Sequence, residues 1–372
     1  MRKIPVWALQ PGMKTGKAVY DAKGMLLLNT QVIIKAKYIH NLRLLGISSI
    51  YIEDEIIPDV FIEDVILDET RIKAQTMIRD ILVNIEKQPK KAMPKAVFNK
   101  SSFSETVDSI VEQLLQNQNL MINLSDIRTS DGYTFSHCVN VAVLAVTTGI
   151  SLKYPRSMLN EIALGSLLHD LGKVRIPLTI LNKSGSLTDD EYAEIKKHPT
   201  LGYEMIRKQD FIKSSSCMTV YQHHERINGK GYPRGLTSDQ IHPFARIAAV
   251  VDVYDALVAD RPYRKAMHSY KALEILESGG DEYDLNVLHN FMQHVAAYPV
   301  GNFVSLSSGE VGAVVQNTVG FPWRPKVRVL AFKEGPEIVK PYEVDLMEKI
   351  DVVVDGLCDE NEMQNILGTI KN

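Results

Sequence analysis

Apolar residues recur at the spacing of an α-helix through most of the middle of the chain. Residues 104–122, 137–150, 156–171 and 247–258 each place apolar side chains three and four positions apart. A stripe of this kind is typical of a helix that buries one face against its neighbours. We therefore predict a mainly α protein whose central part, up to about Tyr298, is an all-helical domain.

The two ends of the chain have a different pattern. Residues 1–64 mix short apolar runs with Pro-Gly and Lys-Gly turn signals, which predicts a small α/β domain whose role the pattern leaves open. Residues 65–124 contain helical stripes around a lysine-rich stretch with two prolines and are interpreted as a helical linker region. The central helical domain is placed at 125–298. After it, residues 299–372 alternate β-branched runs with glycine and proline, which predicts a short β-rich appendage.

Composition excludes several classes of protein. The 372 residues have a formal net charge of −3, which argues against binding to a nucleic-acid polymer. Cys138, Cys217 and Cys358 form no CxxC pair, which argues against a disulfide framework and a thiolate zinc site. No apolar run reaches the roughly 18 residues of a membrane span, and the N-terminus lacks a continuous apolar signal core. We expect a cytoplasmic protein. The helices before residue 124 could pair two chains in a homodimer or pack within one.

Histidine and aspartate gather in segments that are otherwise built for burial. Five of the ten histidines fall within one stretch of fewer than a hundred residues, and two aspartates lie in apolar helical segments. Together they are His137, His169, Asp170, His198, His223, His224 and Asp252. A single histidine on a helix is more often a hydrogen-bonded residue than a ligand. An ionised carboxylate on an apolar helix face is different, because its burial is costly unless a cation compensates it. Convergence of all seven side chains on metal ions is the simplest common explanation.

The ligand types indicate which metals and how many. Imidazole and carboxylate without thiolate suit first-row divalent ions such as iron, manganese or zinc. Seven ligands are too many for one ion that keeps an open position, so two ions sharing a bridging carboxylate fit better. Two-metal sites stabilise the attacking and leaving oxygens in displacement at phosphorus, and they lower the pKa of a bound water so that hydroxide exists near neutral pH.

Lys173 follows three residues after Asp170, in the segment HDLGKVRIP. We predict that Gly172 ends the preceding helix, so that the Lys173 ammonium emerges beside the metals and holds a phosphate oxygen. The alternative is a cation near a helix C-terminus, where the helix dipole favours positive charge.

These segments resemble the HD-GYP subgroup of the HD phosphohydrolase superfamily. The matching stretches are SLLHDLGKVRIP, LNKSGSLTDDEYAEIKKHPTLGYEMI, HHERINGKGYPRGL and ARIAAVVDVYDALVADRPYR. They cover residues 125–300 in the family's order and spacing, which is far more specific than a lone His-Asp pair. The stretch ALQPGMKTGKAVYDAKGMLLL also resembles a small domain often found ahead of this module.

The resemblance implies a metal-dependent phosphodiesterase that hydrolyses cyclic di-GMP to the linear dinucleotide pGpG, with further cleavage to GMP left open. The metal-activated hydroxide would form at a site with two divalent ions, iron or manganese. Asp170 would bridge the ions and act with Lys173 in catalysis. The first ion would also be coordinated by His137, His169 and Asp252. The second ion would also be coordinated by His198, His223 and His224.

Substrate contacts are also implied by the resemblance. Gly231, Tyr232 and Pro233 would form the GYP loop that lines the substrate cleft and contacts partner proteins, although alone they indicate only a turn. Arg261 and Arg264 would meet phosphate or guanine, although two arginines near a helix end are more often solvated.

Two positions depart from the family pattern. Asn228 replaces the usual aspartate of the GYP loop, yet Asn-Gly is itself a strong turn signal. Tyr133 stands where some members carry a glutamate that helps to bind a third metal, so we expect two ions and not three; Asp131 is the residue that could alter this count. Two alternatives remain open. One is a non-enzymatic HD-GYP module that binds nucleotide or protein, and the other is a hydrolase of another cyclic dinucleotide such as cyclic GMP-AMP.

Overall fold

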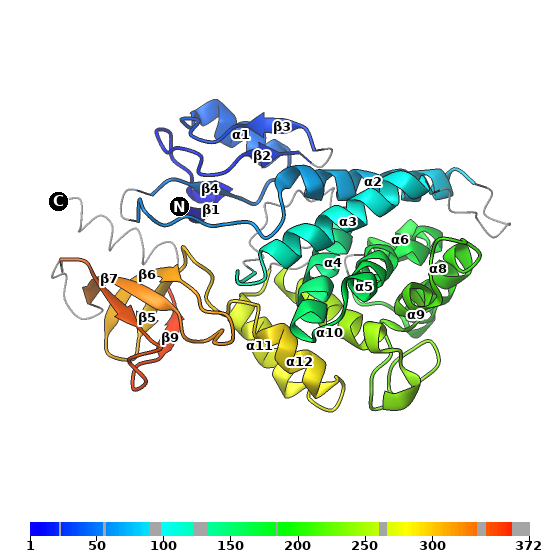
Figure 1. The fold of residues 1–372 in the computed structure, drawn as a ribbon. Coiled ribbons are helices and arrows are strands. Elements are labelled where there is room, and N and C mark those ends of the chain that lie inside the picture. The colour runs from blue at the N-terminus through cyan, green and yellow to red at the C-terminus, as the bar shows by residue number, and fades with distance from the viewer. Residues whose placement is uncertain are drawn as a thin grey trace.

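A helical body forms the middle of the molecule, and two smaller β-containing units lie against it (Figure 1). This computed structural model describes residues 1–21, 24–54, 57–88, 98–122, 133–183, 185–259, 266–332 and 340–358. The mainly α architecture predicted from the sequence is confirmed, including the β-containing unit at each end.

The N-terminal unit has its own small apolar core. It contains β1 (Arg2–Pro5), η1 (Val6–Ala8), β2 (Val19–Tyr20), β3 (Leu26–Leu28), α1 (Ala36–Leu44) and β4 (Ser49–Ile52). β1 pairs antiparallel with β4, and β2 pairs antiparallel with β3. Ile4, Ile34 and Ile50 are almost fully buried between these elements and α1.

The helical body is arranged around α4. Its helices are α2 (Asp68–Glu86), α3 (Lys100–Gln116), α4 (Tyr133–Ser151), α5 (Arg156–Leu168), η3 (Leu171–Arg175), α6 (Leu178–Leu181), α7 (Asp189–Ile195), α8 (His198–Ile206), α9 (Ser214–Gln222), η4 (Ser238–Gln240), α10 (Pro243–Val258), α11 (Ser269–Ser278) and α12 (Leu285–Met292). Residues 137–150 of α4 are all buried, and α4 carries apolar side chains on every face. Such a helix can exist only inside a shell of others. Here α2, α5, α10 and α12 supply that shell.

Local capping explains where several helices begin. Thr188 and Glu191 form the capping box predicted for α7, with each side chain bonded to the other residue's backbone. α3 begins at Lys100, four residues earlier than predicted, because the Asn99 side chain accepts the backbone N–H of Ser102 and caps the helix there.

α2 and α3 belong to the same core as α4 and α5. Ile78 and Ile85 of α2 and Phe103 and Ile110 of α3 are buried in one apolar cluster with the central helices. The domain boundaries proposed above stay predictions. The packing adds that α2 and α3, the described helices of this region, cover the central helices rather than standing apart from them.

Gly172 has a different role from the one predicted. α5 ends earlier, at Leu168, and Gly172 lies inside the short 3-10 helix η3. A Cβ atom at Gly172 would collide with the carbonyl oxygen of His198 and would lie 2.7 Å from the backbone nitrogen of Gly202. Glycine is therefore needed because η3 and α8 approach backbone to backbone. The close approach brings the turn that carries His169 and Asp170 up to the start of α8.

The C-terminal unit is a five-stranded antiparallel sheet in the order β8-β7-β6-β5-β9. Its strands are β5 (Phe303–Leu306), β6 (Glu310–Gln316), β7 (Lys326–Phe332), β8 (Tyr342–Asp345) and β9 (Val354–Leu357). Arg328 on β7 forms two hydrogen bonds with Asp59, at 2.6 and 2.7 Å, which tie the sheet to the segment that leads into α2.

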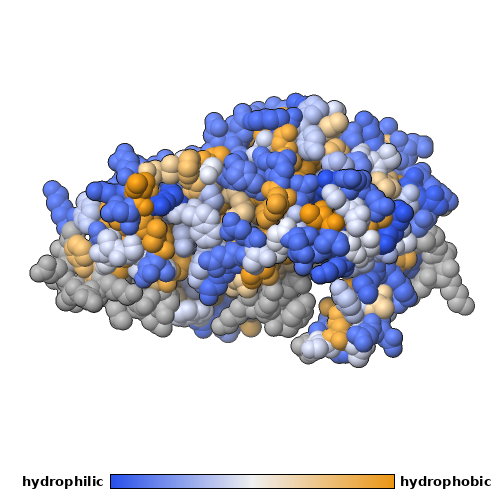
Figure 2. Space-filling model, turned by 90° about the horizontal axis from the view of Figure 1, so that it is seen from below, coloured by the Kyte–Doolittle hydropathy of each residue, from blue (hydrophilic) through white to orange (hydrophobic). Residues whose placement is uncertain are grey.

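Among the described residues seen from below, hydrophilic side chains dominate and apolar ones lie in small groups between them (Figure 2). Within the described ranges, none of the helices has both the length and the apolar character required to cross a bilayer.

The close approach at Gly172 generates a prediction. Gly172→Ala should lower the free energy of unfolding by about 1–3 kcal/mol, because an added methyl group must push η3 away from α8. The matched control is Gly185→Ala, where an added Cβ meets no atom within 4 Å. Urea denaturation of the three proteins measures the effect. Equal midpoints for the two variants would contradict the proposed role of Gly172.

Candidate metal centre

The structure brings together all seven side chains that the sequence singled out. His137 comes from α4, and His169 and Asp170 from the turn between α5 and η3. His198 begins α8, while His223 and His224 follow α9, and Asp252 lies in α10. Their ligand atoms form three overlapping groups, and within each group the atoms lie no more than 4.8 Å apart. All are buried except His224, which is partly exposed.

Asp170 stands between two sets of histidines. Its Oδ2 atom lies 3.6 Å from Nε2 of His137 and 3.4 Å from Nε2 of His169. Its Oδ1 atom lies 3.4 Å from Nε2 of His198 and 3.9 Å from Nε2 of His223. The two oxygens of one carboxylate therefore face different imidazole pairs, which is the arrangement of a bridging ligand.

Asp252 adds a second carboxylate to the cluster. Its Oδ1 atom lies 3.1 Å from Nε2 of His137 and 3.7 Å from Nε2 of His169. Its Oδ2 atom lies 3.9 Å from Nδ1 of His224. Asp252 thus faces mainly the His137 and His169 side, as the resemblance implied.

Three histidines are oriented by a backbone carbonyl three residues earlier in the chain. Nδ1 of His169, His198 and His223 each lies within hydrogen-bond distance of the carbonyl oxygen three residues earlier, at 2.7, 2.8 and 2.9 Å respectively. A proton on Nδ1 satisfies that carbonyl and leaves Nε2 as the free lone pair. Nε2 is the atom that faces Asp170, so the local fold already selects the tautomer that a metal requires.

His137 is oriented by a side chain that sequence reasoning missed. Its Nδ1 atom lies 2.7 Å from Oδ2 of Asp255, which is fully buried on α10. Asp255 follows Asp252 by three residues, so both carboxylates lie on one face of the helix. A second aspartate in the apolar run VVDVYDAL was the available signal. The sequence could not show that it supports a ligand rather than being one.

The electrostatics of the cluster fit a divalent cation. Oδ1 of Asp170 is buried and accepts a hydrogen bond from none of the described residues, which is costly for a carboxylate without a compensating cation. Burial holds the pKa of His223 and His224 well below the ordinary value, so both imidazoles are neutral and can act as ligands. Burial also lowers the pKa of His169, but the charges of Asp170 and Asp252 and the hydrogen bonds to them together outweigh it and raise that pKa to about 10. The space between the Asp170 and Asp252 carboxylates therefore favours a cation.

Lys173 reaches the edge of the cluster from η3. Its Nζ atom lies 2.7 Å from Oδ2 of Asp170, and the side chain keeps about a third of its surface exposed. The predicted location beside the cluster is therefore found, while a contact with phosphate stays a proposal. Arg261, Arg264 and Asp131 lie outside the described residues, as does the side chain of Tyr133.

The backbone of the GYP loop is bound by a buried carboxylate and packs closely against the residues that follow His223. The buried Glu225 carboxylate accepts the N–H groups of Arg234 at 2.8 Å and Leu236 at 2.9 Å. A Cβ atom at Gly231 would collide with the backbone of residues 224–226, so only glycine allows the loop to fold back this far. As a result the Tyr232 ring stacks on the His224 imidazole, with 4.6 Å between centroids and 24° between planes.

Asn228 does more than form a turn. Its side-chain oxygen accepts the N–H of Lys230 at 3.1 Å, and Gly229 takes a φ of +78° next to it, as the Asn-Gly signal predicts. Its Nδ2 atom also donates to Oδ2 of Asp281 at 3.3 Å. An aspartate at position 228 would place a second carboxylate against Asp281. The amide is therefore matched to its neighbour in this chain.

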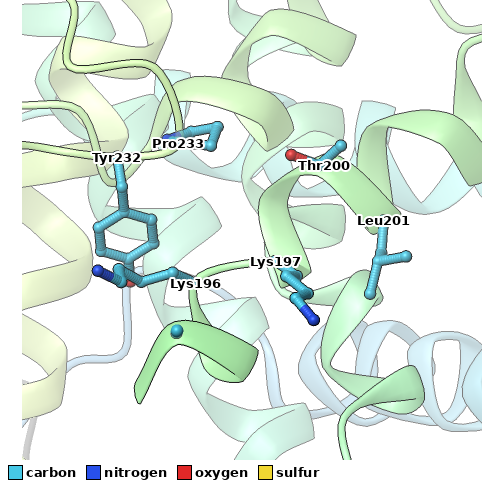
Figure 3. Close-up of a pocket in the computed structure, with 7 residues that line it drawn as sticks. Lys196, Lys197, Thr200, Leu201, Tyr232 and Pro233 are labelled. Atoms are coloured by element: carbon cyan, nitrogen blue, oxygen red, sulfur yellow. The ribbon is translucent and has the colours of Figure 1, made fainter. Parts of the chain in front are cut away.

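A pocket of about 430 Å³ adjoins the cluster (Figure 3). It is lined by Ala193, Lys196, Lys197, Thr200, Leu201, Tyr232 and Pro233. Tyr232 belongs to the pocket lining and also contacts the cluster. Its ring stacks on His224, and its centroid lies 6.5 Å from the ring centroid of His198. Tyr232 and Pro233 thus line a pocket, while Gly231 packs against backbone, and contact of the three residues with substrate stays a prediction.

Comparison with known proteins identifies the family. A family model described as HD domain matches residues 92–287, which include all seven clustered residues. The chain belongs to the HD domain family. A second model, described as a KOW domain associated with HD domain, matches residues 303–366 of this HD domain protein.

Three curated relatives confirm the HD-GYP resemblance. Cyclic di-GMP phosphodiesterase PA4108 of Pseudomonas aeruginosa is 36% identical over 241 residues, covering 65% of this chain and 58% of the relative. Cyclic di-GMP phosphodiesterase PdeB of Borreliella burgdorferi is 27% identical over 242 residues, covering 64% and 63%. 3'3'-cGAMP-specific phosphodiesterase 1 of Vibrio cholerae is 36% identical over 166 residues, covering 45% and 38%. The chain therefore spans less than two thirds of each of these relatives.

The bridging position of Asp170 generates a prediction. Asp170→Asn keeps the shape of the side chain but removes its charge, so ions on both sides of the residue should be lost. We expect a fall from about two Mn²⁺ per chain to less than one. Asp108→Asn is the control, because Asp108 is an exposed acceptor for Asn160 at 2.8 Å. Elemental analysis after anaerobic loading and desalting measures the content. A full complement of metal in Asp170→Asn would contradict the bridge.

Proposed function

We propose that this HD domain protein is a metal-dependent phosphodiesterase that opens cyclic di-GMP to linear pGpG at a two-metal site. The observation that carries the proposal is the geometry of Asp170, whose two oxygens face separate pairs of histidines. The names of the two relatives with the longest matches support cyclic di-GMP as the substrate.

The chain's own residues account for binding and orientation. His137, His169 and Asp252 would hold one ion, while His198, His223 and His224 would hold the other, and Asp170 would join them. When bound, two divalent ions stabilise the attacking and leaving oxygens of a phosphodiester and lower the pKa of a coordinated water. The apolar shell around α4 keeps bulk water away from the buried ligands, which strengthens every charge interaction within the site.

Lys173 is proposed as the residue that orients the scissile phosphate. Its ammonium lies at the rim of the cluster and is partly exposed, so a phosphate entering from solvent would meet it before the buried ligands. A cation bound at Asp170 would also weaken the attraction of that carboxylate for Lys173, which would leave the ammonium available to an anionic oxygen.

The adjoining pocket is proposed to take one nucleotide of the substrate. Lys196 and Lys197 bring positive charge to its lining, Lys197 in an ion pair with Glu194, and Tyr232 adds an aromatic ring beside Lys196 (Figure 3). Aromatic rings bind nucleobases by stacking, while lysines attract phosphate. Sequence reasoning missed these lysines, although they directly precede His198 in the segment EIKKHP.

Cyclic GMP-AMP is the second candidate substrate. It is favoured by the 36% identity to the cGAMP-specific enzyme, but that match covers less of this chain than the match to PA4108 does. The non-enzymatic alternative is less well supported, because every predicted ligand is present and brought together.

Product analysis tests the proposed function. The Mn²⁺-loaded protein and the protein loaded anaerobically with Fe²⁺ should convert cyclic di-GMP to pGpG, with slower turnover of 3'3'-cGAMP and cyclic di-AMP. Chromatography of the nucleotides at several times measures each rate. Faster turnover of 3'3'-cGAMP would replace the substrate and keep the reaction. A fully metal-loaded protein that cleaves none of the three would contradict the proposal.

Removal of the Lys173 charge tests its role separately. Lys173→Met should lower kcat/KM for the dinucleotide by about 10²–10³-fold, by analogy with the loss of one charge-stabilising donor. The metal content at saturating Mn²⁺ should stay unchanged. Lys213→Met is the control, since Lys213 is exposed and pairs with Glu161 at 2.9 Å. An unchanged kcat/KM would contradict a contact between Lys173 and the scissile phosphate.

A further inference from the structure

A chain of hydrogen bonds connects α2 with the metal centre. The guanidinium of Arg71 donates to Oδ1 of Asn140 at 3.1 Å, and Nδ2 of Asn140 donates to Oδ1 of Asp255 at 3.1 Å. Oδ2 of Asp255 lies 2.7 Å from Nδ1 of His137. The opposite nitrogen of His137 faces Asp252 and Asp170. The orientation of this imidazole is therefore fixed by a connected series of side chains that begins outside the cluster.

The inner links of the series are shielded from water. Asn140 is 1% exposed, Asp255 is fully buried and His137 is 2% exposed. If the Asn140 amide turned away, water could not readily replace its hydrogen bond to Asp255. Asn140 in turn needs a donor on its oxygen to hold one amide orientation, and Arg71 is that donor. Each link thus depends on the one before it.

A second contact fixes the same two helices. Nε2 of Gln75 donates to Oγ of Ser136 at 3.1 Å. Gln75 lies four residues after Arg71 on α2, and Ser136 lies four residues before Asn140 on α4. The two contacts therefore join successive turns of α2 to successive turns of α4, and the two helices run antiparallel. His137 lies between Ser136 and Asn140 on α4. They set both the rotation and the register of α2 against α4.

The N-terminal unit contacts α2 at the same turn. Gly24, with a φ of +79°, approaches Ile72 so closely that a Cβ atom there would collide with the Cγ2 atom of Ile72. Ile72 is the neighbour of Arg71 in sequence. In Figure 1 the N-terminal unit lies beside the start of α2, in agreement with this contact. The start of α2 is thus packed between the N-terminal unit and α4.

We propose that Arg71 and Asn140 are positioning residues for the metal ligand His137. They do not touch the metal or the substrate. They hold Asp255 in the one orientation that presents Nε2 of His137 to the ion shared with His169 and Asp252. The inference rests on the proposed metal centre, and it extends the set of residues that serve the centre to a helix outside the predicted catalytic domain.

Metal release tests this role directly. Arg71→Met should release one of the bound Mn²⁺ ions about tenfold faster to excess chelator, within the range found for the loss of outer partners of metal-bound histidines. The ion held by His198, His223 and His224 should leave at the parent rate. Arg71→Lys keeps a donor and should restore part of the difference. Lys73→Met is the matched control on the same helix, since Lys73 pairs only weakly with Glu105 at 3.5 Å.

A double variant separates positioning from general stability. If Arg71 acts through Asn140, then Arg71→Met should have almost no further effect on metal release in an Asn140→Ala protein. An effect that persists undiminished in that protein would overturn the proposal. So would a parent-like release rate in Arg71→Met. Where Asn140→Ala fails to fold, the comparison of Arg71→Met, Arg71→Lys and Lys73→Met still decides the matter.

The metal readout keeps this inference separate from the proposed function. A protein that cleaves cyclic di-GMP but shows no change of metal release in Arg71→Met would overturn the positioning role alone. A protein that shows the predicted release rates but cleaves no cyclic dinucleotide would overturn the proposed function alone.

Discussion

The buried negative charge of Asp170 is the constraint on which the rest of the molecule depends. A carboxylate with 3% of its side chain exposed is destabilising unless positive charge or hydrogen bonds surround it. A cation held between Asp170 and imidazoles from four different helices would supply this compensation, together with the Lys173 ammonium. The helices must therefore meet at one point, and the apolar faces around them fill the remaining space. Glycine at position 172 allows this convergence, because no other residue lets η3 lie against the start of α8.

Much of this arrangement could be predicted from the sequence, because its signals are local. Helical stripes of apolar residues, the capping box at Thr188 and the unusual acidic residues in buried segments each lie within a short stretch of chain. The seven clustered residues were found in this way. The end of α5 was predicted wrongly, because glycine marks either a helix end or a close backbone contact, and sequence alone does not distinguish the two.

The supporting residues could not be predicted, because their partners are distant in sequence. Asp255 and His137 are 118 residues apart, and Arg71 and Asn140 are 69 apart. Nothing near Arg71 in the sequence indicates that its guanidinium bonds an amide inside the core. The same holds for the lysines that line the pocket, since two lysines between α7 and α8 are normally solvated. Ligands can thus be recognised by their chemistry, whereas the residues that hold them become visible only in the fold.

The pairing of Asn228 with Asp281 bears on how such chains are recognised in sequence collections. In the usual GYP-loop motif an aspartate stands at the position of Asn228. Here the carboxylate belongs to Asp281, on a segment 53 residues away, and the amide faces it. A carboxylate therefore still stands at this corner of the loop, supplied by Asp281. An aspartate at position 228 would face Asp281, so a motif that demands aspartate in the loop would pass over chains in which an amide and a carboxylate pair here.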